Sequence, residues 1–224
     1  MSRTQNRPLP TKRMSLKTAW SITLISGVLG TLILWFKLNP LTGILGLSSL
    51  AIYSFIYTPM KQKTPWAVFI GAFPGAAPPL IGWTAFEASD KIAISPAALS
   101  VFCIQFMWQF PHFWSIAWLS HDDYLRAGYK MMPFNAGRSE RSAQLILLYT
   151  LFCIPASMLP WALNQPMVGN VAFAVAVASG VGFSFCAYRL RTRLSMDAAK
   201  HLMYASFLYL PLVQVIYVLD KIPH

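Results

Sequence analysis

Two adjacent aspartates are the residues of this sequence best suited to chemistry. Asp122 and Asp123 stand in HDDYLRAGYK, residues 121–130, just after an apolar run that ends at Leu119. Only 7 of the 224 residues are acidic, so two adjacent aspartates at the end of an apolar segment suggest a specific role. Carboxylates bind Mg²⁺ through oxygen, and Mg²⁺ typically completes its shell with waters and phosphate oxygens. The pair therefore predicts a magnesium site for a phosphorylated ligand.

Basic residues gather near this pair. Arg126 and Lys130 follow it, and the segment TPMKQKTP, residues 58–65, adds Lys61 and Lys63. Such side chains neutralise phosphate charge. A prenyl diphosphate fits this arrangement, with its apolar tail among the hydrophobic segments and its head group at the loop. Charge alone leaves a second interpretation open, in which the aspartates are ordinary solvated loop charges and one of them pairs with Arg126.

The elements that must position these residues are transmembrane helices. Hydrophobic residues make up 56% of the chain and charged residues 11%, against about a quarter charged in soluble domains. Continuous apolar runs favour helices over barrel strands, which alternate. We predict an all-α, polytopic transmembrane helical bundle in a lipid bilayer, forming one membrane-embedded domain over residues 1–224. Its seven or so spans, each approaching the ~20 residues needed to cross, are 18–36, 41–57, 66–86, 97–119, 143–163, 171–188 and 201–219.

The distribution of basic residues predicts the orientation of the bundle. The net charge of +11 does not indicate nucleic acid as a partner, because nearly all basic residues fall on one side of the predicted membrane. The opposite side keeps only Lys37, Lys91 and Lys221. The positive-inside rule therefore places the amino terminus and the 120–142 loop in the cytoplasm.

Prolines and cysteines within the spans have simpler interpretations. Pro74, Pro78 and Pro79 are expected to break or bend the third helix, either for packing or to open a cavity. The three cysteines have no pairing or metal spacing, so they are expected to be small core hydrophobes.

Six segments, in order along the chain, resemble the protoheme IX farnesyltransferases, a branch of the UbiA-type intramembrane prenyltransferases. They are RTQNRPLP (3–10), YTPMKQKTP (57–65), GAFPGAAPPLIGW (71–83), WQFPHFW (108–114), DDYLRAGYKMMP (122–133) and AAKHLMYASFLYLP (198–211). The resemblance implies nine helices, a bacterial inner (cytoplasmic) membrane, and transfer of farnesyl from farnesyl diphosphate to a vinyl group of haem b with Mg²⁺. It also implies downstream partners in haem A synthesis or oxidase assembly.

The resemblance also implies roles for residues. Asp123 with Tyr124 matches the family's second acidic motif, with Asp122 beside it, although Arg126 stands where the superfamily places a further aspartate. The implied catalytic residues are Asp122, Asp123 and Lys61, the two aspartates being the metal ligands. The implied substrate-binding residues are Arg3, Arg7, Lys63, Tyr57, Tyr124, Arg126, Lys130, His112 and Trp108. For His112, binding to haem iron or a propionate and a hydrogen-bonded place in the core both remain open.

The start of the chain departs from the family pattern. RTQNRPLP normally follows the first aspartate-rich motif, so the sequence is expected to lack the first two helices and that motif, and a two-sided diphosphate clamp would keep one side. Two alternatives to the haem reaction are a UbiA-type enzyme with another acceptor, such as a quinone precursor, and a non-catalytic transporter or structural membrane subunit.

Overall fold

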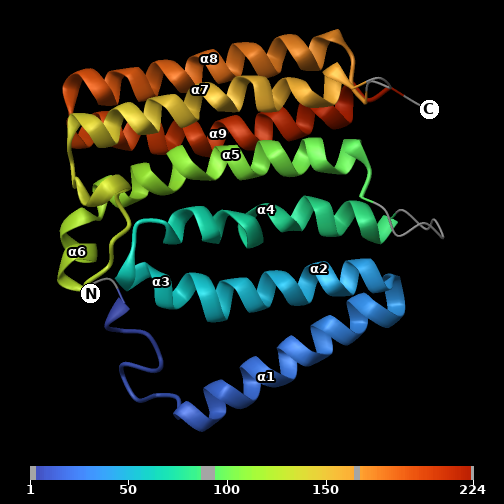
Figure 1. Ribbon diagram of the computed structural model, residues 1–224, viewed down its shortest axis with the longest axis vertical. Coiled ribbons are helices and arrows are strands. Elements are labelled where there is room, and N and C mark those ends of the chain that lie inside the picture. The colour runs from blue at the N-terminus through green and yellow to red at the C-terminus, as the bar shows by residue number, and fades with distance from the viewer. Residues whose placement is uncertain (1–3, 87–93, 164–166, 223–224) are drawn as a thin grey trace.

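Long helices run roughly side by side in the computed structural model, which describes residues 4–86, 94–163 and 167–222 (Figure 1). The helices are α1 (Leu16–Ile33) with a π-helical continuation (Leu34–Leu38); α2 (Pro40–Ala51), continued by a second π-helical stretch (Ile52–Tyr57) and α3 (Thr58–Lys63); α4 (Ala67–Phe86); α5 (Pro96–Leu119); α6 (His121–Arg126); α7 (Glu140–Ala162); α8 (Asn170–Arg193); and α9 (Met196–Leu219). A 3₁₀ turn at Pro133–Asn135 lies between α6 and α7.

Within the described ranges, six helical segments are long and apolar enough to cross a membrane. They are Leu16–Leu38, Pro40–Lys63, Ala67–Phe86, Glu140–Ala162, Asn170–Arg193 and Met196–Leu219. The helix α5 has 24 residues but is more polar, and it buries Gln109, His112 and Ser115. It packs against α4, α7 and α9, as expected of a helix whose polar side chains face the inside of a bundle. The predicted all-α polytopic bundle is confirmed, and the chain is an integral membrane protein.

Serine and asparagine side chains fix where several helices begin. Ser15, Asn39, Ser95, Ser139 and Ser195 each accept a hydrogen bond from the amide three residues on. Such caps satisfy backbone donors that have no partner inside the helix. The long α5 and α7 therefore begin at defined residues on either side of the segment that carries the aspartates.

The prolines of the third span do not interrupt it. The helix α4 continues through Pro74, Pro78 and Pro79 without a break, so the expectation of a break is wrong. Neighbouring helices can compensate for backbone hydrogen bonds lost at proline in a membrane bundle. Gly71 has the clearer structural role, because a Cβ there would lie 2.6 Å from Cε2 of Tyr57. The missing side chain lets the Tyr57 ring lie directly on the α4 backbone.

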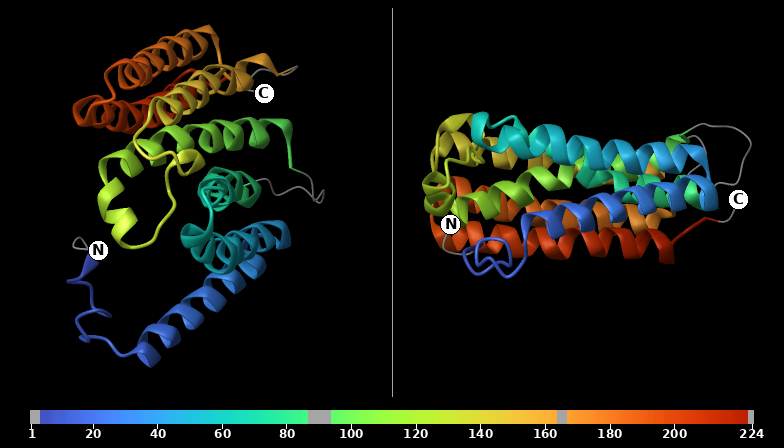
Figure 2. Two further views of the ribbon diagram at one scale, coloured as in Figure 1. Left: turned by 60° about the vertical axis from the view of Figure 1, so that its left-hand side comes forward. Right: turned by 90° about the horizontal axis from the view of Figure 1, so that it is seen from below.

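The turns at one end of the bundle bring the basic segments together. The described amino-terminal segment, α3, α6 and the α8–α9 turn lie at this end, and the carboxyl end of α9 lies at the other (Figures 1 and 2). We call it the basic end. The helices α7, α8 and α9 form a cluster with α5 beside it, then α4, then α2, and α1 at the outer edge (Figure 1).

Candidate functional site

The two aspartates lie on α6, a short helix at the basic end that begins directly after α5. Its first turn holds Asp122 and Asp123, and its last residue is Arg126. Gly128 follows with a φ of 71°, a left-handed conformation that glycine adopts without steric cost. The dipeptide Ala127–Gly128 of the family-like motif is thus the stop of the helix that carries the carboxylates.

Two further hydrogen bonds define this stop. The amide of Tyr129 donates to the Tyr124 carbonyl at 2.8 Å, and the amide of Gly128 donates to the Leu125 carbonyl at 2.9 Å. This pair of bonds is a Schellman motif, and its usual apolar contact is supplied by the rings of Tyr124 and Tyr129, 6.2 Å apart. The chain consequently reverses after α6 and returns toward α3.

Each aspartate has its own arginine. Asp123 Oδ1 lies 2.5 Å from Nη2 of Arg126, and Asp122 Oδ2 lies 3.1 Å from Nη2 of Arg138. The Asp122 side chain is 70% exposed and that of Asp123 only 21%. Neighbouring positions on a helix point about 100° apart. The carboxylates therefore do not converge on one point, and Asp123 is the more enclosed of the two.

The segment after α6 is fastened to the rest of the bundle at two points. The amide of Lys130 donates to the Lys61 carbonyl at 2.8 Å, which joins this segment to α3. Nε of Arg138 donates to the Trp118 carbonyl at 2.8 Å, which joins it to the end of α5. Between these points lies a cavity of about 530 Å³ whose polar lining includes His121, Tyr124 and Lys130. An anionic group entering here meets basic and phenolic side chains together.

The surroundings of His121 shift its pKa. Burial lowers the pKa of His121, the nearby Arg138 lowers it further, and Asp122 partly offsets both effects. The imidazole is therefore held toward its neutral form, in which one ring nitrogen donates and the other accepts. Gly137, with a φ of 60°, lies close enough to this ring that an added Cβ would be 3.1 Å from His121 Nε2.

Lys61 stands over two tyrosine rings. Its Nζ lies 4.2 Å from the ring centroid of Tyr57 and 5.4 Å from that of Tyr53, which is cation–π geometry. The π-helical stretch that ends at Tyr57 explains this placement, since the amide of Thr58 bonds back to the Tyr53 carbonyl and the wide turn precedes Pro59. A wider turn relieves the clash that proline causes in a regular helix.

His112 belongs to a second polar group inside the bundle. Its Nδ1 lies 2.8 Å from Oγ of Ser206 on α9, and its ring stacks on Trp108 with centroids 4.5 Å apart. Trp108 Nε1 donates to the Ser206 carbonyl at 2.8 Å, and Phe207 meets the imidazole edge-on. We call His112, Ser206, Trp108 and Phe207 the histidine cluster. Eight residues of helix separate His112 from Ser120, about 12 Å along the axis.

Ser206 Oγ lies between two partners, 2.8 Å from His112 Nδ1 and 2.5 Å from the Met203 carbonyl. When the hydroxyl donates to the carbonyl, it accepts from Nδ1 of His112, and the lone pair of the imidazole lies on Nε2. An imidazole fixed in this way at one nitrogen has the form that binds metals through the other.

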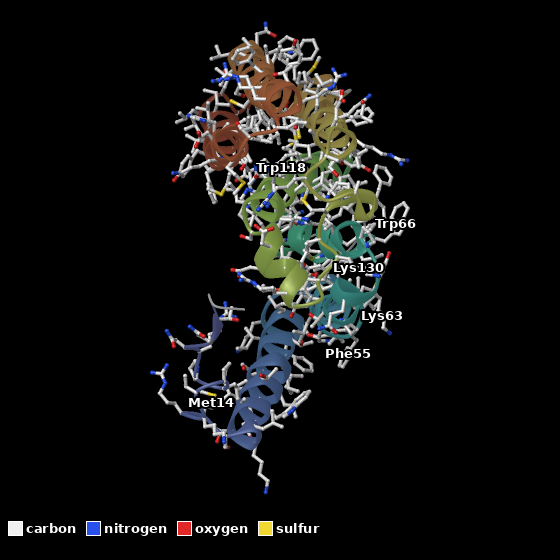
Figure 3. All side chains as sticks on the ribbon, turned by 90° about the vertical axis from the view of Figure 1, so that its left-hand side faces the viewer. Met14, Phe55, Lys63, Trp66, Trp118 and Lys130 are labelled. Carbon is white, nitrogen blue, oxygen red and sulfur yellow. The ribbon has the colours of Figure 1, made fainter. Side chains whose placement is uncertain are left out.

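The other residues expected at the site are scattered. Lys63 and Lys130 lie near one another beside α3 in the view onto the basic end, whereas Met14 lies well away from them on the amino-terminal segment (Figure 3). Arg7 is exposed on that segment. Arg3 lies outside the described residues. The structure thus brings together the residues from α3 and the 120–142 loop, and it leaves the histidine cluster as a separate group.

Two residues at these sites, Arg138 and Ser206, carried no sequence signal of their own. Arg138 holds Asp122, and Ser206 orients His112. His121 stands next to the aspartate pair in the sequence, where it could serve the head group or face solvent, and it lines the loop cavity. Ser206 stands within one of the six family-like segments, so its position was marked although its role was not. The cysteines Cys103, Cys153 and Cys186 are free and half-buried or buried, as the sequence predicts.

The donor set suits a metal that takes few protein ligands. Among residues 4–86, 94–163 and 167–222, no three His, Cys, Asp or Glu side chains are grouped as a metal site would require. Mg²⁺ is commonly held by one or two carboxylates, with substrate phosphates and water completing the shell. A partly enclosed carboxylate beside basic side chains fits that pattern, with Asp123 the better placed of the pair.

The fold and these groups define a class of protein, a polytopic helical membrane protein with basic and acidic side chains gathered at one end of an apolar bundle. We call the site formed at this end by Lys61, Lys63, Asp122, Asp123 and Lys130 the mouth. A sequence model of the UbiA prenyltransferase family matches residues 1–210. The chain is 46% identical to the protoheme IX farnesyltransferase of Cytophaga hutchinsonii over 224 residues, 99% of this chain and 76% of that protein. Those of Christiangramia forsetii and Flavobacterium psychrophilum are 44% and 40% identical, each with 72% of its length covered. No solved structure matches. The chain belongs to the UbiA prenyltransferase family.

Proposed function

We propose that this chain transfers the farnesyl group of farnesyl diphosphate to a vinyl group of haem b, forming haem O. Relatives that carry the name protoheme IX farnesyltransferase match nearly the whole chain. The observation that carries the proposal is the joining of α6 to α3 through the Lys130 amide and the Lys61 carbonyl. This contact brings a carboxylate-bearing helix and a basic segment to one mouth of an apolar bundle, as a diphosphate with a long prenyl tail requires.

The reaction begins at the bond between the farnesyl carbon and the diphosphate oxygen. When this bond breaks, the electron pair leaves with the diphosphate and an allylic cation remains. The vinyl group donates its electrons to that cation, and water then supplies the hydroxyl of the hydroxyethylfarnesyl product while a proton is released. Charge develops on the diphosphate in the transition state, so fixed cations at the mouth lower the barrier.

Residues at the mouth divide this work. Mg²⁺, when bound through Asp123, would neutralise part of the diphosphate charge. Lys61, Lys63 and Lys130 supply further positive charge. Arg126 can release the Asp123 carboxylate and bind a phosphate oxygen instead. Asp122 acts on the ligand through Arg138, whose guanidinium it orients. Tyr124 lines the cavity beside α6, and the Tyr57 ring lies under the ammonium group of Lys61.

The histidine cluster is the proposed contact for haem. His112 would bind the haem iron through Nε2, with its Nδ1 held by the hydrogen bond to Ser206. Trp108 stacks on the imidazole and limits its rotation. The separation of about 12 Å along α5 suits a substrate pair in which the diphosphate stays at the mouth and the farnesyl chain extends inward.

The proposed setting is the inner membrane of a bacterium, with the basic end in the cytoplasm. Nearly all basic residues outside the spans lie at this end, as the positive-inside rule requires. Farnesyl diphosphate carries several negative charges and would approach from this aqueous side. Haem O would remain in the lipid phase and pass to proteins of haem A synthesis or oxidase assembly.

A reconstitution assay tests the proposal. Membranes that contain this chain receive haem b, farnesyl diphosphate and Mg²⁺, and pigments are extracted for chromatography and mass spectrometry. Binding of a non-hydrolysable farnesyl thiodiphosphate, with and without Mg²⁺, is measured alongside. Haem O, or Mg²⁺-dependent binding of the analogue together with haem binding that requires His112, supports the proposal. Analogue binding with prenylation of an aromatic acid and no affinity for haem would indicate a different acceptor.

A further inference from the structure

Two apolar grooves meet at the basic end on the flank of α7. The first, about 500 Å³, is lined by Leu145, Leu148 and Leu151 along α7 and by Arg191 from α8. The second, about 530 Å³, has an aromatic wall formed by Trp66, Phe69, Phe110, Trp114 and Tyr149. Phe134, Arg141 and Leu145 line both grooves, so they form a partition between two apolar channels with a cationic residue at the junction.

Arg141 at the junction and Arg191 in the first groove are incompletely paired. Arg141 lies over the Phe134 ring at 4.7 Å, and it makes no ion pair within the part of the chain that the structure describes. Arg191 Nη2 lies 3.8 Å from Glu140 Oε1, longer than a charge-assisted hydrogen bond, and its buried Nε has no hydrogen-bond partner. Two guanidinium groups therefore retain donors for an oxyanion.

The grooves are separate from the proposed reaction site. Neither is lined by Asp122, Asp123, Lys61 or His112. Arg138, the nearest arginine in sequence to Arg141, is already bound to Asp122 and to the Trp118 carbonyl. A ligand in the grooves would thus use cations that the diphosphate mouth does not need.

One cationic junction between two apolar channels indicates a ligand with one anionic group and two apolar chains. A phospholipid has one phosphodiester and two acyl chains, and basic pockets between membrane helices recognise anionic head groups. Among the described residues no acidic side chain lines either groove, and the one carboxylate beside them, that of Glu140, lies 3.8 Å from Arg191, so the two arginines outnumber it where the head group would bind. We propose that Arg141 and Arg191 bind the phosphate of an anionic two-chain phospholipid whose acyl chains occupy the two grooves.

Native mass spectrometry of the purified chain in detergent tests this proposal. Phosphatidylglycerol and phosphatidylcholine with identical acyl chains are added separately, and bound lipids are counted. Two arginines at a membrane surface should favour the anionic lipid by about 10- to 30-fold. The double variant Arg141→Gln, Arg191→Gln should lose this preference. Arg193→Gln is the matched control, because Arg193 lies on the same helix two residues on, is exposed and lines neither groove.

A second variant tests the groove without changing any charge. Leu148 is 44% exposed, so Leu148→Trp should fold and should fill the first groove. Its phosphatidylglycerol binding should fall by about the same factor as that of the double arginine variant. Equal binding of both lipids, an equal loss in Arg193→Gln, or displacement of the lipid by millimolar inorganic phosphate would each overturn the proposal. The last outcome would instead indicate a site for free anions.

Discussion

The aspartate helix α6 and the histidine cluster are both polar, yet different forces hold them. At α6 the partners are charged, and each pair has one exposed member, Asp122 at 70% and Arg126 at 71%, and one part-buried member, Arg138 at 28% and Asp123 at 21%. In the cluster the partners are neutral and buried, with Ser206 fully enclosed and His112 8% exposed. Exposed ion pairs contribute about 0–1 kcal/mol, whereas leaving a buried donor unpaired costs about 1–3 kcal/mol.

The difference in burial determines which group can rearrange. An arginine at the surface can exchange a carboxylate for a phosphate at little cost, so the ion pairs of α6 do not preclude binding of a ligand there. A histidine held between a serine and a tryptophan cannot turn without breaking buried bonds. We therefore expect the mouth to adapt to its substrate and the histidine cluster to be preorganised.

The largest expected effect follows from Asp123→Asn at the adaptable mouth. Loss of partners that only support a metal ligand lowers metal affinity about 10–100-fold, so loss of a ligand itself should lower Mg²⁺-dependent binding of farnesyl thiodiphosphate by at least about 100-fold. Asp197→Asn, an exposed aspartate in the first turn of α9, serves as control. Unchanged Mg²⁺-dependent binding in Asp123→Asn would show that this carboxylate is only a partner for Arg126.

Ser206→Ala examines the preorganised group. The variant leaves the buried Nδ1 of His112 without its hydrogen-bond partner, so the free energy of unfolding should fall by about 1–3 kcal/mol and haem affinity should fall with it. Thermal unfolding in detergent and haem titration measure the two effects. Ser184→Ala is the matched control, because Ser184 Oγ is buried without a hydrogen-bond partner and its removal should be neutral or stabilising. Equal losses in both variants would contradict the role given to Ser206.

Two glycine substitutions test whether the turn at Gly128 positions α6. Gly128→Ala places a side chain at a φ of 71°, which should destabilise the Schellman turn by about 1–2 kcal/mol and weaken analogue binding through misplacement of α6. Gly182→Ala in α8 meets no atom within 4 Å and should stabilise its helix by about 0.5–1 kcal/mol. A lower unfolding temperature for Gly128→Ala and a higher one for Gly182→Ala would confirm the role given to Gly128. An unchanged unfolding temperature for Gly128→Ala would refute it.

The membrane-spanning helices could be predicted from the sequence, whereas the contacts between distant residues could not. Apolar runs near 20 residues are enough to locate the helices, and the aspartate pair is visible as a rare charge cluster. The bond between His112 and Ser206 joins residues 94 apart, and it depends on how α5 and α9 are rotated about their axes. The pairing of Arg138 with Asp122 likewise depends on the reversal at Gly128. The continuous α4 shows that proline is a weaker signal inside a membrane bundle than in water.

The smallest effect concerns pH at the edge of the mouth. Burial, followed by the charge of Arg138, lowers the pKa of His121 below its ordinary value of about 6.5. The unfolded chain therefore binds this proton more readily, so the stabilisation is complete above about pH 6.5 and is lost as the pH falls through the lowered pKa of the folded state. Unfolding midpoints between pH 5 and 7.5 should therefore fall as the pH falls, and His121→Gln should reduce the slope of midpoint against pH.

His201 provides the control for this slope. It is an exposed histidine whose Nδ1 meets the Asp197 carbonyl, so His201→Gln should keep the parent slope. A His121→Gln slope equal to that of the parent would mean that Arg138 is screened from the imidazole, and that the mouth is more open to water than its hydrogen bonds indicate.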